Sequence, residues 1–314
     1  MDRHDVDWKG YFAAAPTPFT KDGELDRELL ANVLSHLVDQ RAHGVLVNGS
    51  TGECYAQTTE ERRTVTEVAV RAIAGAAPVL VGTSSTSVDE TIALARHAHG
   101  AGADGVLFCP PPGARLTESE VVDFYRHVCA ATPGPVMAYN IPSEVVTDMR
   151  PETIAEVADI PNVVAVKDST PDDLRFQRTV LELSDRLRVF GNVLTPAGIS
   201  MMIAGCGGDG HFGSGMPLGS LLADAFDHVW AGRAAEALAI ARRFSELRGA
   251  LHAPDGNGVF GGMQAQLKTM MRLLGQPAGY PRPPRRALED DAGAVEGLAA
   301  LLERHGVLAA RCPA

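Results

Sequence analysis

Short apolar runs alternate with longer segments of helical period along most of the chain. Each run is four or five residues long, is bounded by turn residues, and predicts a β-strand. Helix start signals such as Thr58-x-x-Glu61 and Thr117-x-x-Glu120 stand in the segments between them. The predicted strands are Tyr11–Ala15, Gly44–Val47, Pro78–Gly82, Gly105–Phe108, Val136–Tyr139, Val163–Lys167, Arg188–Gly191 and Asp209–Phe212.

Strict alternation of apolar strands with helices indicates parallel pairing, because each crossover helix covers the sheet. Eight such units close naturally into a (β/α)8 barrel, which is the fold class that we predict. A doubly wound open sheet is the competing arrangement.

Four more helix-like segments follow the eighth run, with no further strand. We interpret them as the last barrel helix and a C-terminal helical extension, with residues 1–230 forming the barrel and residues 231–314 packing on it as part of one structural unit. The Pro-rich stretch Tyr280–Pro284 resembles a linker before the final helix. The four segments are Leu218–Ala231, Ala234–Leu247, Val259–Leu274 and Asp291–His305.

Composition and charge narrow the classes of partner. A chain of 314 residues is long for one core, but α/β barrels reach this size as single domains. The formal net charge of −11 argues against nucleic acid or an anionic membrane surface as the main partner, because these need a concentrated basic face. Any anionic substrate must therefore be bound by local groups.

Cysteine usage and hydropathy bear on the cellular compartment and on metal binding. The five cysteines are odd in number and far apart, with no C-x-x-C pair and no histidine at ligand spacing, so we expect reduced, mostly buried thiols. No apolar run reaches 18 residues, and Met1–Lys9 does not resemble a signal peptide. We expect a cytoplasmic protein. The cysteines are Cys54, Cys109, Cys129, Cys206 and Cys312.

Lys167 is the strongest candidate for a catalytic residue. Barrel enzymes gather their reactive groups at the C-terminal ends of strands, and Lys167 ends the sixth run. Burial there disfavours the ammonium form and lowers the pKa, which leaves a neutral amine able to attack a ketone. The alternative is a lysine that leaves the sheet and reaches solvent.

Two other strand ends carry polar groups. The segment Gly49–Glu53 offers two hydroxyls and backbone N–H groups at a strand-to-helix turn, which suits a carboxylate ligand. An ordinary glycine-rich turn is its alternative interpretation. Tyr139 ends the strand unit before that of Lys167, so both side chains should reach one mouth of the barrel, where the phenol could relay protons. A tyrosine that only packs is the alternative.

The glycine cluster Gly205–Gly210 has the letters G-x-G-x-x-G, but helix-like residues precede it and a strand follows it. That order is the reverse of a dinucleotide-binding turn, so we reject a nucleotide site. His211, with Asp209 nearby, could form half of an acid–base or metal pair, although a lone histidine beside glycines is more often structural.

With these segments in place, the chain resembles the dihydrodipicolinate synthase and N-acetylneuraminate lyase family of class I Schiff-base lyases, from about Trp8 to Val307. Five ordered motifs at the spacing of one barrel are far more specific than any one of them. The motifs are Ala15–Phe19, Gly49–Glu53, Tyr139–Ser143, Ala165–Ser169 and Asp209–Ser214.

The resemblance implies that Lys167 forms an imine with a 2-oxo acid such as pyruvate, that Ser50 and Thr51 hold the carboxylate, and that Tyr139 moves protons. The protonated imine is itself the electron sink, so neither a metal nor an organic cofactor is required. The family is usually tetrameric, so we expect a homo-oligomer, a tetramer or a dimer. Further substrate-binding positions within the same motifs are Gly49, Ser169, Phe212 and Ser214.

Three departures from the family pattern bear on the second substrate. Glu144 stands where dihydrodipicolinate synthases usually have an arginine, and Cys109–Gly113 replaces a tyrosine pair of their proton relay. Asn192, Val193 and Leu194 replace the acidic pair that the neuraminate-lyase branch has after the seventh strand. From Glu144, Val193 and Leu194 we predict a distal pocket more apolar than a sugar-acid site, suited to a shorter or aromatic 4-hydroxy-2-oxo acid.

The function predicted from these residues is a class I aldolase or lyase that makes or cleaves a 4-hydroxy-2-oxo acid, with pyruvate and an aldehyde as the partners. A hydro-lyase could use the same Lys167 imine to eliminate water from a 2-oxo-3-deoxy acid. Dihydrodipicolinate synthase itself is a second alternative. A non-catalytic barrel that binds a 2-oxo acid is a third, and it would bind pyruvate without forming an imine.

Overall fold

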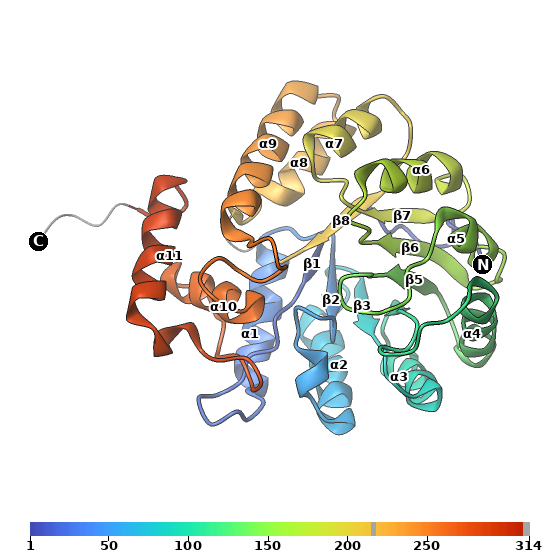
Figure 1. Cartoon of the computed structure of the whole chain (residues 1–314), viewed down its shortest axis with the longest axis horizontal. Helices are drawn as coiled ribbons and strands as arrows, with labels where there is room; N and C mark the ends of the chain where they lie inside the picture. The colour runs from blue at the N-terminus through green and yellow to red at the C-terminus, as the bar shows by residue number, and fades with distance from the viewer. Residues whose placement is uncertain (215–217, 310–314) are drawn as a thin grey trace, which may run out of the picture.

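The computed structural model describes residues 1–214 and 218–309 (Figure 1). Within them, strands β1 to β8 pair in parallel in chain order, and β8 pairs with β1 to close a barrel. The (β/α)8 prediction is confirmed, and each strand lies within about one residue of its predicted bounds. The strands are β1 Gly10–Ala14, β2 Gly44–Val47, β3 Val79–Gly82, β4 Gly105–Phe108, β5 Val136–Asn140, β6 Val163–Asp168, β7 Arg188–Gly191 and β8 Gly210–Gly213.

A ring of helices surrounds the strands (Figure 1). The two predicted start signals are capping boxes, in which Thr58 and Thr117 accept from the backbone N–H groups of Glu61 and Glu120 and the glutamates bond back. The helices of the ring are α1 Arg27–Asp39, α2 Thr59–Ile73, α3 Val88–Gly100, α4 Glu118–Ala131, α5 Pro151–Val157, α6 Asp173–Leu183, α7 Pro196–Ile203 and α8 Leu221–Trp230.

Aromatic side chains fill the interior of the barrel. The rings of Phe12, Phe190 and Phe212 contact one another at centroid distances of 5.0, 5.3 and 5.1 Å. Trp8 closes the N-terminal end so tightly that a Cβ at Gly105 would lie 2.4 Å from its ring. The barrel is therefore a packed core, and chemistry is confined to its C-terminal end.

The helices after the barrel are α9 Ala234–Leu251, α10 Met263–Leu273 and α11 Ala292–Arg304. Helix α9 packs on α7 and α8, and α10 packs on α11. Helix α10 begins later than predicted, because Gly258 forms β-bridges with His252 and Gly261 in the preceding turn. The proposed division at residue 230 coincides with the end of α8, and residues 310–314, with Cys312, lie outside the described residues.

The prediction of a linker at Tyr280–Pro284 is wrong. Tyr280 exchanges backbone hydrogen bonds with Phe19, and Arg282 lies over the Phe19 ring at 4.1 Å from its centroid. The Arg282 guanidinium also donates to both carboxylate oxygens of Glu61, at 2.8 and 2.7 Å. The segment is thus fastened to the barrel by partners more than 200 residues away in sequence.

A fully buried ion pair ties the C-terminal extension to the barrel. Lys268 Nζ on α10 donates to Glu53 Oε1 at 2.5 Å, to the Thr17 carbonyl at 2.6 Å and to the Tyr280 carbonyl at 2.8 Å. Both charged side chains have no exposed surface. Three acceptors satisfy the three donors of the ammonium group, which is the condition under which a buried charge is tolerated.

We predict that Lys268→Met destabilises the protein by about 3 to 5 kcal/mol, because it leaves the Glu53 carboxylate buried without its cation. Denaturant unfolding followed by circular dichroism measures the loss. The double variant Glu53→Gln/Lys268→Met should lose less unfolding free energy than the sum of the losses in the two single variants. Arg178→Ala, which breaks ion pairs on the surface of α6, is the control and should leave the midpoint nearly unchanged. A loss of stability in Lys268→Met no larger than that in Arg178→Ala would contradict the prediction.

Candidate active site

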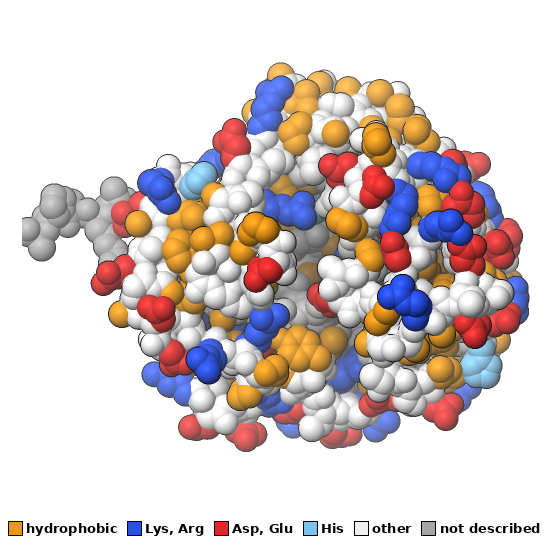
Figure 2. Space-filling model, in the orientation of Figure 1, with side chains coloured by type: hydrophobic (Ala, Val, Ile, Leu, Met, Phe, Trp, Pro, Cys, Tyr) orange, Lys and Arg blue, Asp and Glu red, His pale blue; other side chains and the backbone are white. Residues whose placement is uncertain are grey.

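A cavity of about 530 Å³ lies at the C-terminal end of the barrel. The ends of β5, β6, β7 and β8, the loop after β2, and the helices α9 and α10 supply its lining residues. Figure 2 shows the hollow near the centre of this face, with acidic and basic side chains at its edge. The cavity is therefore where the predicted site residues can meet.

Lys167 reaches this cavity from β6. Its Cα is in register with Tyr139 on β5 and Phe190 on β7, so these side chains share the inner face of the barrel. Lys167 Nζ lies 4.1 Å from the centroid of the Tyr139 ring and 5.0 Å from that of Phe212. The alternative of a lysine extending into bulk solvent does not hold.

Burial lowers the pKa of Lys167 to about 8, while the nearby Glu144 carboxylate and the Cys109 thiol act in the opposite direction. The neutral amine is therefore a minor fraction of Lys167 at neutral pH, but far larger than for a lysine in water. No ion pair among residues 1–214 and 218–309 includes Lys167, so its ammonium form has no carboxylate in contact to stabilise it.

Tyr139 is held beside the lysine by its own backbone. Its N–H donates to the hydroxyl of Tyr125 at 3.1 Å, and that hydroxyl donates to the Phe108 carbonyl at 2.9 Å. The Tyr139 phenol lies close to the hydroxyls of Ser169 and Ser50, both of which act to lower its pKa. Burial outweighs this effect and raises the pKa of Tyr139, so the phenol keeps its proton.

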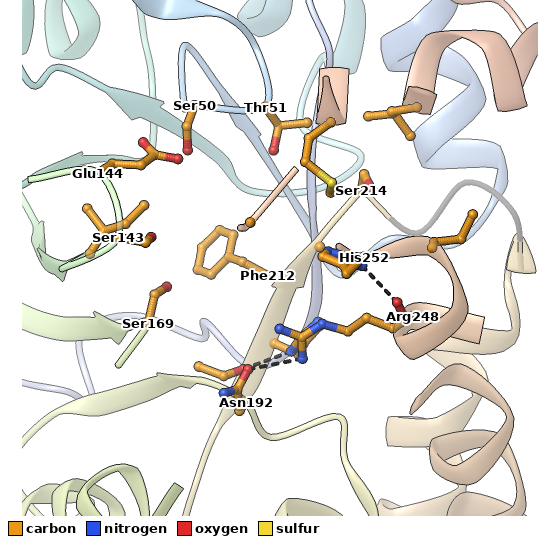
Figure 3. Close-up of a pocket in the computed structure, with 18 of the residues that line it drawn as sticks. Ser50, Thr51, Ser143, Glu144, Ser169, Asn192, Phe212, Ser214, Arg248 and His252 are labelled. Carbon is orange, nitrogen blue, oxygen red and sulfur yellow. Dashed lines mark hydrogen bonds between the residues drawn. The ribbon is translucent and has the colours of Figure 1, made fainter. Parts of the chain in front are cut away.

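The loop after β2 presents Ser50 and Thr51 to the cavity (Figure 3). The Gln264 side-chain amide on α10 donates to the Ser50 carbonyl at 3.1 Å, which links the loop to the C-terminal extension. Gly49 does not line the cavity. Its carbonyl accepts from the Gly52 N–H at 3.0 Å, so its position is that of a turn residue behind the two hydroxyls.

The other predicted positions, Ser169, Phe212 and Ser214, all line the cavity. His211 also lines it, with Nδ1 bonded to the Gly191 carbonyl at 2.8 Å, and burial lowers its pKa to about 3. Asp209 does not pair with it, because its carboxylate binds two arginines beside the N-terminal segment. His211 is thus a neutral, positioned imidazole, and the idea of a His211–Asp209 pair is wrong.

Glu144 is the acidic group of the cavity, and the sequence indicated it only as a departure from arginine. Its carboxylate lies beside the Ser50 hydroxyl (Figure 3), whose interaction with it acts to lower the pKa of Glu144. The side chain is exposed to the cavity, yet surrounding protein desolvates it enough to raise its pKa, against the opposing effect of Lys167. Tyr139, Ser50 and Glu144 therefore form a chain of hydrogen-bonding groups.

The prediction of an apolar distal pocket made by Val193 and Leu194 is wrong. Both side chains are buried in the layer between the strands and the outer helices, and neither lines the cavity. The chain leaves the barrel after Gly191 and turns outward into α7, which carries these side chains away from the mouth. On this side the cavity is lined by the polar residues Asn192, Arg248 and His252, together with apolar side chains of α9 such as Phe244, Leu247 and Leu251.

The described residues do not form a metal centre, since no group of three His, Cys, Asp or Glu side chains is placed to hold an ion. Cys109 and Cys129 are buried, Cys54 is half-buried and Cys206 is exposed, and all four are free thiols. Among the helices described, none is long and apolar enough to cross a membrane.

Comparisons with known proteins agree with this geometry. The model of the dihydrodipicolinate synthetase family matches residues 7–302. A 4-hydroxy-tetrahydrodipicolinate synthase from Gluconacetobacter diazotrophicus is 31% identical over 286 residues, which is 91% of this chain and 93% of the relative. An uncharacterized DapA-like lyase from Rhizobium meliloti is 35% identical over 185 residues, which is 59% of this chain and 61% of the relative's length.

A solved structure of the same fold is a prophage protein of the dihydrodipicolinic acid synthase family from E. coli K12, in complex with pyruvate. It superposes with a TM-score of 0.86 at 24% identity, and the match covers 96% of this chain and 100% of that protein. At this identity the likeness establishes the barrel and its C-terminal helices.

We predict that Lys167 reacts with an amine-acylating reagent along a pH curve whose midpoint is about 8, because only the neutral amine reacts. The Glu144 carboxylate raises the pKa of Lys167, so Glu144→Gln should move the midpoint to lower pH and speed labelling at pH 7. Peptide mass spectrometry across a pH series measures both effects. Glu156→Gln, an exposed change on α5, is the control. A midpoint that rises or stays unchanged in Glu144→Gln would refute the electrostatic coupling.

Proposed function

The chain belongs to the dihydrodipicolinate synthetase family, and from this we propose that it is a class I aldolase that joins pyruvate to an aldehyde or cleaves a 4-hydroxy-2-oxo acid into them. The observation that carries the proposal is the position of Lys167, whose buried amine with a pKa of about 8 opens onto the cavity. At that pKa about a tenth of the amine is neutral at pH 7, far more than for a lysine in water, and this neutral fraction is the nucleophile that imine chemistry needs.

The reaction begins at Lys167 Nζ, which attacks the ketone carbon of pyruvate to give a carbinolamine. Loss of water forms the protonated imine. The pyruvate carboxylate rests against the hydroxyls of Ser50 and Thr51 and the N–H groups of their loop, which bind an anion without a formal positive charge. This places the methyl carbon toward the open part of the cavity.

Removal of a proton from that methyl carbon gives an enamine, with the imine nitrogen taking the electron pair. The enamine carbon then attacks the aldehyde carbon, and the resulting alkoxide takes up a proton. Tyr139 is placed to donate the proton that the alkoxide takes up, because its phenol is protonated and its ring centroid lies 4.1 Å from Lys167 Nζ. In the first transfer the phenol oxygen accepts the methyl proton only as its own proton passes through Ser50 to the Glu144 carboxylate, which is the base of the relay. Water releases the product and restores the amine.

Glu144 can complete the proton path that the replaced tyrosine pair leaves open. Its carboxylate lies beside the Ser50 hydroxyl, which in turn lies close to the Tyr139 phenol, so we expect protons to pass between the cavity and the phenol within a single chain. The raised pKa of Glu144 brings it closer to the pH at which it can both accept and donate. This assignment supports an aldol reaction without a tyrosine from a neighbouring subunit.

The hydro-lyase alternative uses the same imine and differs in its product, since it releases water and no aldehyde. The synthase named for the relatives would condense pyruvate with an amino-bearing semialdehyde, and Glu144 replaces the arginine that such synthases usually carry. We also propose, from the family resemblance, a cytoplasmic homo-oligomer, a dimer or a tetramer, which light scattering would test.

We predict that pyruvate followed by borohydride adds about 72 Da to the protein, the mass expected for a reduced imine. Intact-mass spectrometry detects the adduct, and peptide mapping should place it on Lys167. Lys167→Ala should abolish it, whereas Lys9→Ala, a change at an exposed lysine, should retain it. Absence of an adduct in the unaltered protein, together with pyruvate binding, would support the non-catalytic barrel and refute the aldolase.

A further inference from the structure

Arg248 is a cation of the cavity that the imine chemistry does not use. It comes from α9, in the C-terminal extension, and its Nη1 donates to Asn192 Oδ1 at the end of β7 over 3.4 Å. Figure 3 shows its side chain extending from the helix toward Asn192. The guanidinium therefore lies where the barrel and the extension meet around the cavity.

The guanidinium has spare hydrogen-bonding capacity. It carries five N–H donors, and the contact with Asn192 uses only one of them at a long distance. Within residues 1–214 and 218–309, no carboxylate forms an ion pair with Arg248. Its side-chain nitrogens are either hydrogen-bonded or accessible. The remaining donors thus face the cavity.

Burial lowers the pKa of Arg248, opposed by Asp173, but an arginine remains charged at neutral pH. A partly desolvated guanidinium without a carboxylate is costly, and an anionic ligand would offset that cost. Its fork geometry matches a carboxylate, to which it can donate two parallel hydrogen bonds.

The charges of the cavity are arranged asymmetrically. Glu144 lies beside Ser50 on one side of Phe212, and Arg248 lies on the other side (Figure 3). His211 is neutral and adds no charge between Lys167 and Arg248, both of which lower its pKa. The pyruvate carboxylate takes the hydroxyls and N–H groups of the Ser50–Thr51 loop, and a second carboxylate is attracted at the Arg248 side, away from Glu144. The apolar side chains Leu251 and Met270 also line the cavity and can accommodate a short hydrocarbon chain.

We propose that Arg248, with Asn192, binds a second carboxylate at the distal end of the substrate. The aldehyde would then be a semialdehyde that carries its own carboxylate, and the 4-hydroxy-2-oxo acid would be a dicarboxylate. This inference rests on the proposed aldolase function and specifies its substrate class. It also explains how an acidic residue can stand at position 144, since the distal clamp comes from another element.

The test compares aldehydes matched in size but not in charge, with pyruvate as the common donor. Two pairs of aldehydes differ in carbon-chain length: the short pair is glyoxylate with acetaldehyde, and the longer pair is succinic semialdehyde with butanal. The readout is the ratio of kcat/KM for the charged over the neutral member, so a general loss of folded or active protein cancels. We expect the unaltered protein to favour the charged member of at least one pair.

Arg248→Gln keeps a side chain that can bond to Asn192 and removes the charge. We expect this variant to lower the charged-to-neutral ratio by about 10-fold to 100-fold, as expected for loss of a charge-assisted hydrogen-bonding pair. Arg248→Lys should lose less, because it keeps the charge but not the fork. The matched control is Arg242→Ala, an exposed change on the same helix, which should leave the ratio unchanged.

Failure of this inference can be told apart from failure of the proposed function. A ratio unchanged in Arg248→Gln, or a preference of the unaltered protein for the neutral member of both pairs, would overturn the distal clamp while the Lys167 adduct with pyruvate persists. Absence of the adduct from the unaltered protein would overturn the aldolase proposal and this inference with it.

Discussion

The ion pair between Glu53 and Lys268 is the contact on which the organisation of the cavity depends. Glu53 ends the loop that presents Ser50 and Thr51, and Lys268 lies on α10 in the extension. Because neither charge reaches solvent, the pair holds the loop and the extension in one arrangement. The same extension supplies Arg248, so the two ends of the proposed substrate are positioned by one buried contact.

Lys167 and Lys268 both lie inside the protein, but the groups that they contact give their amines different roles. Burial lowers the pKa of both Lys167 and Lys268, and in Lys268 the contact with Glu53 opposes the change. Lys268 has acceptors for all three of its protons, so its ammonium form serves as a structural cation. Lys167 has aromatic rings and only a more distant carboxylate, so its amine is left reactive. Sequence alone placed Lys167 correctly because it ends an apolar strand.

The sequence predicts structural features that depend on neighbouring residues. It does not predict the positions of side chains that are set by contacts with distant parts of the chain. The apolar runs gave all eight strands, and the capping signals gave the starts of α2 and α4. Val193 and Leu194 were misplaced because the direction of the chain after β7 depends on packing against α7. Arg248 was not found, because it is one of several arginines on an amphipathic helix and nothing local shows which of them faces a cavity.

Because the protein as a whole is acidic, binding of an anionic substrate depends on where individual cations lie in the cavity. A formal net charge of −11 repels a dianion at long range, although salt screens this repulsion beyond about 8 to 10 Å. Attraction must therefore arise at short range, where a partly buried guanidinium and a protonated imine act in a medium of lower dielectric constant. The proposed anion-binding site, built from hydroxyls, backbone N–H groups and one arginine, would limit the attraction to the interior of the cavity. Anions are then selected by the positions of these groups, and the acidic outer surface does not concentrate anions unselectively.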